Sequence, residues 1–330
     1  MRDLRVDNAK GILIFLVVLG HFIEAVKGWE ATDLRGLWTA IYLFHMPAFI
    51  FLAGMTAKSD NLLRRVLNMA VLLVFFHLAL VIPLTAMAGG KSPVGLFQPY
   101  WMMWFLLSMI WWMLFLPVVN RLPYPLVIST ALAVGAGLVP SIDYGFSLSR
   151  TLVYLPFFVA GNLYGWRLLA WLKQLSSLFG LAGMVLFLSV AAFFLMQADL
   201  AGNWFRGSQG YAALGSGEAD GLLIRAGLLG LASIALILFL IALPANQSWL
   251  TKLGSASLAV FLLHGFVVKP FGVLVGSKLA DYSTGSLLLL LLGLSAVTVA
   301  VLGLPVWDRL IRQQASRVVE KVLGLMGKLR

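Results

Sequence analysis

Apolar runs of helical length recur along the whole chain and are separated by short polar breaks. A helix that crosses a bilayer needs about 17 to 25 such residues, and the alternating pattern of membrane β-strands is absent from the sequence. Because 61% of the 330 residues are hydrophobic and only 11% are charged, one soluble core cannot bury this surface. The pattern predicts an all-α integral membrane protein, a bundle of about ten transmembrane helices. The predicted spans are 10–28, 36–56, 66–88, 100–119, 124–140, 150–170, 178–197, 222–243, 254–275 and 285–305.

Positive charges are distributed unevenly between the two sets of connecting segments. The net charge of +11 would indicate a nucleic-acid partner in a soluble protein. With both termini in the cytoplasm, sixteen of the 24 Lys and Arg residues lie on the cytoplasmic side and eight on the other. The positive-inside rule explains this bias without nucleic acid. It predicts an N-in, C-in bundle with an even number of spans, lying in membrane lipid.

Two parts of the chain differ from the predicted spans. The break from Asp199 to Gly221 is rich in glycine and is predicted to be an outward-facing loop. Residues 308–330 mix apolar and basic residues, which predicts a basic amphipathic cytoplasmic tail on the membrane surface. Residues 1–307 are predicted to form a single polytopic membrane domain, whose first span is an uncleaved helix.

Ionisable side chains inside a membrane span are costly and indicate functional sites. His21 and Glu24 lie three residues apart in the first span, so the carboxylate can hydrogen-bond the imidazole on a helix. A carboxylate in this place sets the histidine tautomer and raises its basicity, which is the chemistry of an oriented general base. His45 lies near the middle of the second span beside Pro47 and is expected to line the same cavity. A structural, hydrogen-bonded histidine is the alternative at both positions.

Four basic residues are expected at the cytoplasmic mouth of the bundle. Lys10 shares a helix face with His21, eleven residues further on and about 16 Å away along the axis. Lys58, Arg64 and Arg65 follow the second span, close to where Lys10 emerges. Such a cluster suits the phosphates of a phosphorylated cosubstrate. Positive-inside anchoring is the alternative.

The remaining candidates are less specific on spacing alone. Trp104, near the outer end of the fourth span, suits either an interfacial aromatic belt or stacking on a sugar ring. His264 in the ninth span fits function and structure equally well, and His77 has no partner or motif and is assigned a structural role. No metal site is predicted, because the four histidines lack ligand spacing and the chain has no cysteine.

Short motifs follow one another in order along nearly the whole chain, and together they are fairly specific. With these motifs the chain resembles the membrane acyltransferase-3 family, in particular its fucose 4-O-acetylase-like branch. The motifs are Arg5-Val6-Asp7-Asn8-Ala9-Lys10-Gly11 with ten residues between Lys10 and His21, Phe44-His45-Met46-Pro47, Phe51-Leu52-Ala53-Gly54, Trp104-Phe105-Leu106, Arg150 with Leu155-Pro156-Phe157-Phe158-Val159-Ala160-Gly161, and Leu253-Gly254 through Ser257-Leu258 to Leu263-His264-Gly265.

The sequence departs from the usual family pattern at two places. Lys10 occupies a position where arginine is common, and lysine keeps the charge but loses the bidentate fork. Many members carry two arginines separated by two residues at the start of the third span, whereas Arg64 and Arg65 are adjacent. Both departures concern the residues that the resemblance assigns to coenzyme A.

The resemblance implies transfer of an acyl group, usually acetyl from cytoplasmic acetyl-CoA, to a sugar hydroxyl of a polysaccharide, glycolipid or lipid-linked precursor. It makes His21, oriented by Glu24, the base that activates the hydroxyl. His45 is then expected to donate to the oxyanion or to position the acceptor. Direct transfer and an acyl-histidine intermediate both remain open.

The two substrates are expected on opposite sides of the bundle. Acetyl-CoA is the predicted acyl-donor cosubstrate, bound by Lys10, Lys58, Arg64 and Arg65, and no metal is involved. The glycan or glycolipid acceptor is expected from outside, with Trp104, Arg150 and His264 as its contacts. Arg150, at the outer end of the sixth span, is equally consistent with a snorkelling helix-end residue.

The sequence therefore predicts an acyl-CoA-dependent O-acetyltransferase of a cell-envelope glycan in a bacterial inner membrane. Glycan-biosynthesis proteins are further candidate partners. A proton-coupled secondary transporter is the alternative, because histidines within spans also suit proton coupling, but the two halves of the chain show no convincing repeat. A noncatalytic scaffold or glycan sensor is a third reading, against which the intact set of His21, Glu24 and His45 counts.

Overall fold

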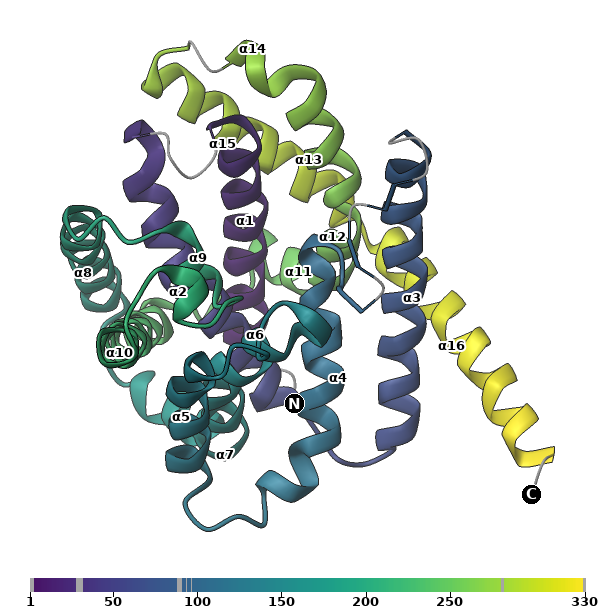
Figure 1. Ribbon diagram of the computed structural model, residues 1–330. Helices are drawn as coiled ribbons and strands as arrows, with labels where there is room; N and C mark the ends of the chain where they lie inside the picture. Colours follow the sequence, from purple (N-terminus) through teal and green to yellow (C-terminus); the bar gives the residue numbers. More distant parts are fainter. Residues whose placement is uncertain are drawn as a thin grey trace.

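The fold is helical throughout the part of the chain that the structure, a computed structural model, describes. That part comprises residues 3–27, 32–87, 91–92, 94–95, 97–279 and 282–328, and it contains no β-strand (Figure 1). The α-helices are α1 (Leu4–Lys27), α2 (Thr32–Thr56), α3 (Leu62–Met87), α4 (Trp104–Val119), α5 (Pro125–Gly135), α6 (Leu148–Val153), α7 (Leu155–Leu172), α8 (Ser177–Gln197), α9 (Gly202–Arg206), α10 (Glu218–Ala242), α11 (Trp249–Ser255), α12 (Ser257–Leu263), α13 (Gly265–Phe271), α14 (Ser277–Leu279), α15 (Thr284–Leu302) and α16 (Pro305–Lys328). Short 3₁₀ turns are η1 (Trp101–Met103), η2 (Ala136–Leu138), η3 (Gly145–Ser147) and η4 (Ala212–Leu214), and η5 (Gly272–Gly276) is a π-helical turn.

Eight helical segments of the described residues are long and apolar enough to cross a membrane. They correspond to eight of the ten predicted spans and confirm the all-α membrane fold. The span predicted at 124–140 is a shorter apolar helix, Pro125–Leu138. The span predicted at 150–170 is divided between α6 and α7, with a break at Tyr154. The total of ten spans and the N-in, C-in orientation stay predictions.

Helix α1 lies at the centre of the bundle and contacts α2, α11, α13 and α15. Its buried Asn8 anchors it, because the amide nitrogen donates to the carbonyls of Pro244 and Asn246, at 2.8 and 3.0 Å. The hydroxyl of Thr251 donates to the Asn8 carbonyl oxygen at 2.5 Å. A polar side chain whose three hydrogen bonds lie within the protein fixes the rotation of α1 about its axis, and with it the direction of His21.

Two helix crossings depend on motif glycines. Gly254 of α11 lies against the backbone of Asp7 in α1, and a Cβ atom there would overlap the Asp7 carbonyl oxygen. Gly54 of α2 and Gly161 of α7 meet the backbones of the opposite helices in the same way, at Phe158 and Phe51 respectively. Small residues let membrane helices approach closely. These motif glycines therefore determine how closely α1 packs against α11 and α2 against α7.

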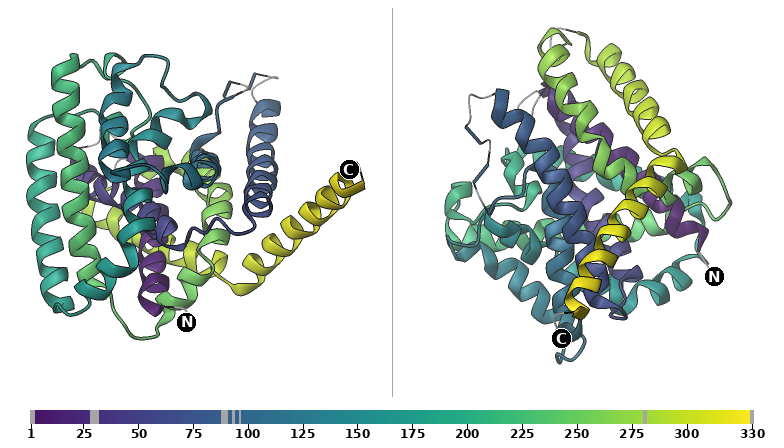
Figure 2. Two further views of the ribbon diagram at one scale, coloured as in Figure 1. Left: turned by 90° about the horizontal axis from the view of Figure 1, so that it is seen from below. Right: turned by 90° about the vertical axis from the view of Figure 1, so that its right-hand side faces the viewer.

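The C-terminal residues form one long helix, α16, which begins at Pro305. The predicted boundary between residues 307 and 308 falls inside this helix. Helix α16 packs against α3 and α12, where Ala315 and Val319 are buried, and it projects from the bundle beside α3 (Figure 2). The segment predicted to be a surface tail therefore also packs against the bundle, at α3 and α12.

The segment between α8 and α10 is a folded cap, which we define as residues 199–217. Trp204 and Phe205 of α9 and Tyr211 are buried in it, and the Trp204 and Tyr211 rings stack at 5.9 Å. Helix α9 contacts α2, so the cap is held against the bundle. It brings Arg206 to the end of α1.

Candidate functional site

A large cavity, here called the large pocket, lies on the side of the bundle where α1 begins. Its volume is about 600 Å³, and α1, α2, α3, α4, α12 and α16 contribute to its wall. Its outer part is polar and its inner part apolar. The outer wall includes Lys10, Thr56, Arg64, Arg65, Asn68, Ser257, Arg312 and Ser316, and the inner wall includes Val17, Met46, Phe49, Phe105, Met109 and Phe261.

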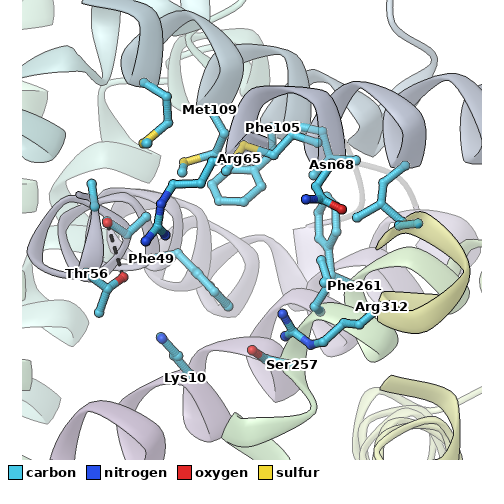
Figure 3. Close-up of a pocket in the computed structure, with 18 of the residues that line it drawn as sticks. Lys10, Phe49, Thr56, Arg65, Asn68, Phe105, Met109, Ser257, Phe261 and Arg312 are labelled. Atoms are coloured by element: carbon cyan, nitrogen blue, oxygen red, sulfur yellow. Dashed lines mark hydrogen bonds between the residues drawn. The ribbon is translucent and has the colours of Figure 1, made fainter. Parts of the chain in front are cut away.

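The structure brings three of the four predicted cofactor residues to this pocket. Lys10, Arg64 and Arg65 line it, whereas Lys58 is exposed and is not among the lining residues. A fourth cation comes from α16: Arg312 reaches the pocket opposite Lys10 and Arg65 (Figure 3). Sequence reasoning missed Arg312 because it treated this segment as a surface tail. Its position one turn after Asp308, on the polar side of an amphipathic helix, was the available signal.

Each arginine at the mouth of the large pocket is paired with a nearby carboxylate. Arg65 bonds Asp60 at 3.2 Å, Arg312 bonds Asp308 at 2.6 Å, and Arg64 is paired with Glu320 of α16. The three arginine side chains are 39 to 57% exposed. Exposed ion pairs contribute little to stability. The pairs of Arg64 and Arg65 are exposed on both sides and therefore exchange partners at little cost, whereas Asp308, the partner of Arg312, is only 18% exposed.

A second, smaller cavity, here called the histidine chamber, lies deeper in the bundle. Its volume is about 80 Å³. Val17, Met46 and Phe261 line both this chamber and the large pocket, so the two cavities are neighbours separated by these apolar side chains. The polar and aromatic side chains of the chamber are His21, Glu24, Tyr42, His45, Trp101, Trp104, Tyr144, Arg150, Tyr154, Phe205, Arg206 and Phe261.

His21 is hydrogen-bonded to a second histidine from the other end of the sequence. Its Nδ1 lies 2.9 Å from Nε2 of His264, which occupies the break between α12 and α13. The ring of Trp101 covers His21 at a centroid distance of 4.5 Å. Nδ1 of His21 is therefore bonded to His264 and not to the Glu24 carboxylate, which was expected to accept its hydrogen bond.

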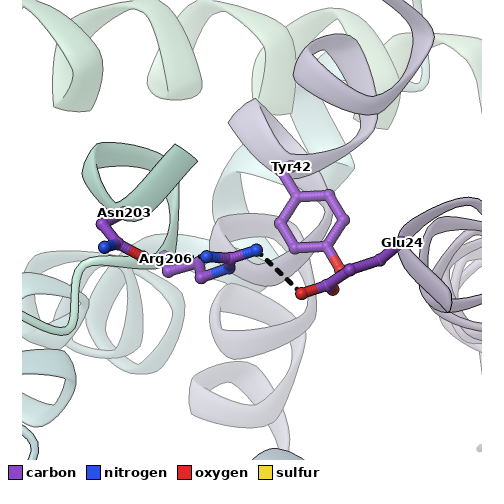
Figure 4. A network of polar contacts seen from close by, with 4 residues as sticks. All are labelled: Glu24, Tyr42, Asn203 and Arg206. Carbon is purple, nitrogen blue, oxygen red and sulfur yellow. Dashed lines mark hydrogen bonds and ion pairs between the residues drawn. The ribbon is translucent and has the colours of Figure 1, made fainter. Parts of the chain in front are cut away.

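Glu24 instead belongs to a polar network that joins α1, α2 and the cap (Figure 4). Tyr42 donates its hydroxyl to one carboxylate oxygen at 2.8 Å, and Arg206 bonds the other at 2.7 Å. Arg206 also donates to the side chain of Asn203, at 2.8 Å. Sequence reasoning assigned no role to Arg206, although it is a basic residue within an aromatic stretch, Trp204-Phe205-Arg206, in a loop near the end of α1.

His45 is buried in the chamber wall, and its Nδ1 lies 2.7 Å from the carbonyl oxygen of Ile41. Since a carbonyl only accepts, this nitrogen carries the proton, and Nε2 of a neutral His45 is an acceptor. A neutral His45 therefore cannot donate to an oxyanion, which was one of its two expected roles. The other role, positioning the acceptor by accepting a hydrogen bond, fits the geometry.

Arg150 and Trp104 lie together, as expected for one substrate site, but they contact each other. The Arg150 guanidinium lies over the rings of Trp104 and Tyr144, at 5.0 and 4.7 Å, and its Nε donates to the carbonyl of Arg206 at 3.1 Å. Arg150 is only 8% exposed. It therefore connects the chamber wall to the cap and does not snorkel to a membrane surface.

The chemistry of this arrangement uses histidine, carboxylate and arginine side chains. Within the described residues, no three His, Cys, Asp or Glu side chains gather closely enough to hold a metal ion. The fold and the two cavities together define a multi-pass membrane protein with a cationic pocket next to a buried histidine chamber.

The chain belongs to the acyltransferase-3 family, because the family model described as an acyltransferase domain matches residues 3–304. It is similar to nodulation protein NolL of Mesorhizobium japonicum, with 27% identity over 190 residues, which are 50% of this chain and 50% of that protein. It is also similar to NolL of Sinorhizobium fredii, with 45% identity over 64 residues, 18% of this chain and 17% of that protein. The chain thus spans half or less of the length of these relatives. No solved structure matches it.

Proposed function

We propose that this protein is an O-acyltransferase that moves an acetyl group from cytoplasmic acetyl-CoA to a sugar hydroxyl of a cell-envelope glycan. Membership of the acyltransferase-3 family supports acyl transfer. The observation that carries the proposal is the pair of neighbouring cavities. One is large and cationic, the other holds His21, and Val17, Met46 and Phe261 line both.

The large pocket suits the acyl donor. Its cations, Lys10, Arg64, Arg65 and Arg312, match the phosphates of coenzyme A, and its apolar inner wall matches an uncharged pantetheine arm. Lys10 and His21 are separated by about 16 Å along α1, a distance that an extended arm can cover. The thioester then lies between Val17, Met46 and Phe261, beside the histidine chamber.

His21 is the proposed base. The acceptor hydroxyl oxygen attacks the thioester carbonyl carbon while His21 takes the hydroxyl proton. As the new carbon–oxygen bond forms, the carbon–sulfur bond breaks, and the thiolate of coenzyme A takes the proton from the imidazolium. A route through an acyl-histidine uses the same residue in two steps and is distinguished by ping-pong kinetics.

In this proposal the reacting hydroxyl of the acceptor enters the histidine chamber. His45 accepts a hydrogen bond from an acceptor hydroxyl, and the aromatic walls contact the sugar. Because Arg150 is held by Trp104 and Tyr144, its role is to shape this wall. A polysaccharide, glycolipid or lipid-linked precursor in a bacterial inner membrane is the proposed acceptor, with glycan-biosynthesis proteins as partners. Assignment to the fucose 4-O-acetylase-like branch belongs to the same proposal.

The test uses the purified full chain in detergent with isotopically labelled acetyl-CoA. Wild type should bind acetyl-CoA and either hydrolyse it slowly or label a glycan fraction from membranes. His21→Ala should retain binding and lose turnover, whereas a double Arg64→Ala/Arg65→Ala variant should bind more weakly. If wild type neither binds nor consumes acetyl-CoA and instead carries a solute with protons across liposomes, the proposal is wrong and the protein is a transporter.

A further inference from the structure

We infer that His264 is a positioning residue that fixes the tautomer of His21, so that Nε2 of His21 is the nitrogen that accepts the proton. The inference concerns how the base is prepared, and it rests on the proposed function for its kinetic consequences. Its structural part, the protonation pattern of two histidines, is testable without any substrate.

The protonation pattern follows from a carbonyl at the end of a hydrogen-bond chain. Nδ1 of His264 lies 3.0 Å from the carbonyl oxygen of Val260. This oxygen also accepts the backbone N–H of His264 at 3.0 Å, and a carbonyl has two lone pairs for two donors. Since the carbonyl cannot donate, Nδ1 of His264 must carry a proton. In the neutral ring, Nε2 of His264 is then an acceptor.

The tautomer of His21 follows from that of His264. Its Nδ1 lies 2.9 Å from the acceptor nitrogen of His264, so Nδ1 of a neutral His21 carries the proton. The lone pair is left on Nε2, at the other side of the imidazole ring. Because His21 lines the histidine chamber, Nε2 is the nitrogen available to an acceptor hydroxyl there.

The geometry of the two rings supports a directed hydrogen bond. The planes of the two rings differ by 8°. The distance between the ring centroids, 5.1 Å, is longer than the 2.9 Å between the bonded nitrogens by about the width of one imidazole ring. The rings therefore lie edge to edge in nearly one plane, and the N–H of His21 points along the lone pair of His264. Trp101 packs against both rings, at 4.5 and 5.6 Å, and restricts their rotation.

His264 cannot act on a substrate directly. Its side chain is fully buried, and both of its ring nitrogens are already used, one by Val260 and one by His21. His264 was expected to contact the substrate. We assign it the orientation of His21 in place of that role. The carboxylate that was expected to orient His21 is held by Tyr42 and Arg206, so His264 takes the orienting role.

The direct test is nitrogen NMR of the full chain labelled at histidine, in detergent at alkaline pH where imidazoles are neutral. The chain has four histidines, so single-histidine substitutions assign every signal. We expect a protonated Nδ1 and an unprotonated Nε2 at both His21 and His264. In His264→Leu, His21 should lose this fixed pattern. A protonated Nε2 at His21 in the wild type would overturn the inference, whether or not the protein transfers acetyl groups.

The kinetic test compares His264→Leu with His264→Gln. Leucine removes the acceptor for His21, whereas the amide oxygen of glutamine can replace it. The leucine variant should lower kcat about 10- to 100-fold, on the order of the loss caused by removing the hydrogen-bond partner of a metal-bound histidine, while KM for acetyl-CoA stays within about twofold. Glutamine should restore most of kcat. Unchanged turnover in a folded leucine variant would contradict the role, and absence of turnover in wild type would contradict the proposed function alone.

Discussion

The two cavities differ in how their charged groups are held. In the large pocket, exposed arginines form ion pairs with Asp60, Glu320 and the partly buried Asp308. In the histidine chamber, His21 and Glu24 are bonded to residues distant in sequence, and the pair of Glu24 and Arg206 is 27 to 28% exposed. His45 in the chamber wall and His264, the partner of His21, are buried. Exposed pairs exchange partners at little cost, whereas buried groups keep their partners because leaving them unpaired is expensive. The first cavity is suited to binding and release, and the second to fixed chemical geometry.

The strongest test of this difference is His21→Ala. Loss of the base should lower kcat for acetyl transfer about 10²- to 10⁴-fold, with little change in acetyl-CoA affinity, because His21 lies in the chamber and not in the large pocket. The measurement is turnover and equilibrium binding on the same preparation. His77→Ala is the control, since His77 lines neither cavity. A large loss of affinity in His21→Ala would mean that the cavities do not divide binding from chemistry.

A smaller effect is expected at the Glu24–Arg206 pair, which fixes the cap to the chamber. Glu24→Gln keeps the shape and removes the charge, and it should lower kcat about tenfold by releasing the cap. The coupling energy between the two sites in a double-mutant cycle with Arg206→Ala should be on the order of 1 kcal/mol, since the two side chains share one hydrogen-bonded ion pair at 2.7 Å. Strictly additive losses would show that the two residues act separately.

Affinity for the donor should respond to the cations of the large pocket. Arg65→Ala and Arg312→Ala should each raise the dissociation constant for acetyl-CoA about five- to tenfold by removing a charge-assisted contact to phosphate, and kcat at saturation should stay near wild type. The measurement is binding at two salt concentrations, since exposed charges are screened. An Arg312→Ala variant with unchanged affinity would exclude α16 from the donor site.

The smallest effect is expected for Lys58→Ala, the matched control. It removes the same charge from the same side of the bundle, but the lysine does not line the large pocket. Its dissociation constant for acetyl-CoA should stay within about twofold of wild type. A loss as large as that of Arg65→Ala would indicate that net charge, and not position, attracts the donor.

Sequence reasoning predicted the helices and the region of the site but not its contacts. The spans follow from composition, and Lys10 and His21 follow from spacing on one helix, which is a local property. The hydrogen bond between His21 and His264 joins residues that are 243 positions apart, and the pair of Glu24 and Arg206 spans 182 positions. Such contacts depend on how each helix is rotated and where it crosses its neighbours. Periodicity in one sequence does not contain that information.

The crossing of α2 and α7 has a consequence for how the protein enters the bilayer. Helix α7 is not among the segments that are apolar enough to span a membrane alone. Its Asn162 donates to the carbonyls of Gly54 and Ala57 at the end of α2, at 3.1 and 3.4 Å. Because a polar amide and a neighbouring Arg167 resist partitioning into lipid, we expect α7 to be accommodated only after α2 is in place. During biosynthesis, α2 then inserts before α7 and provides the surface against which α7 packs.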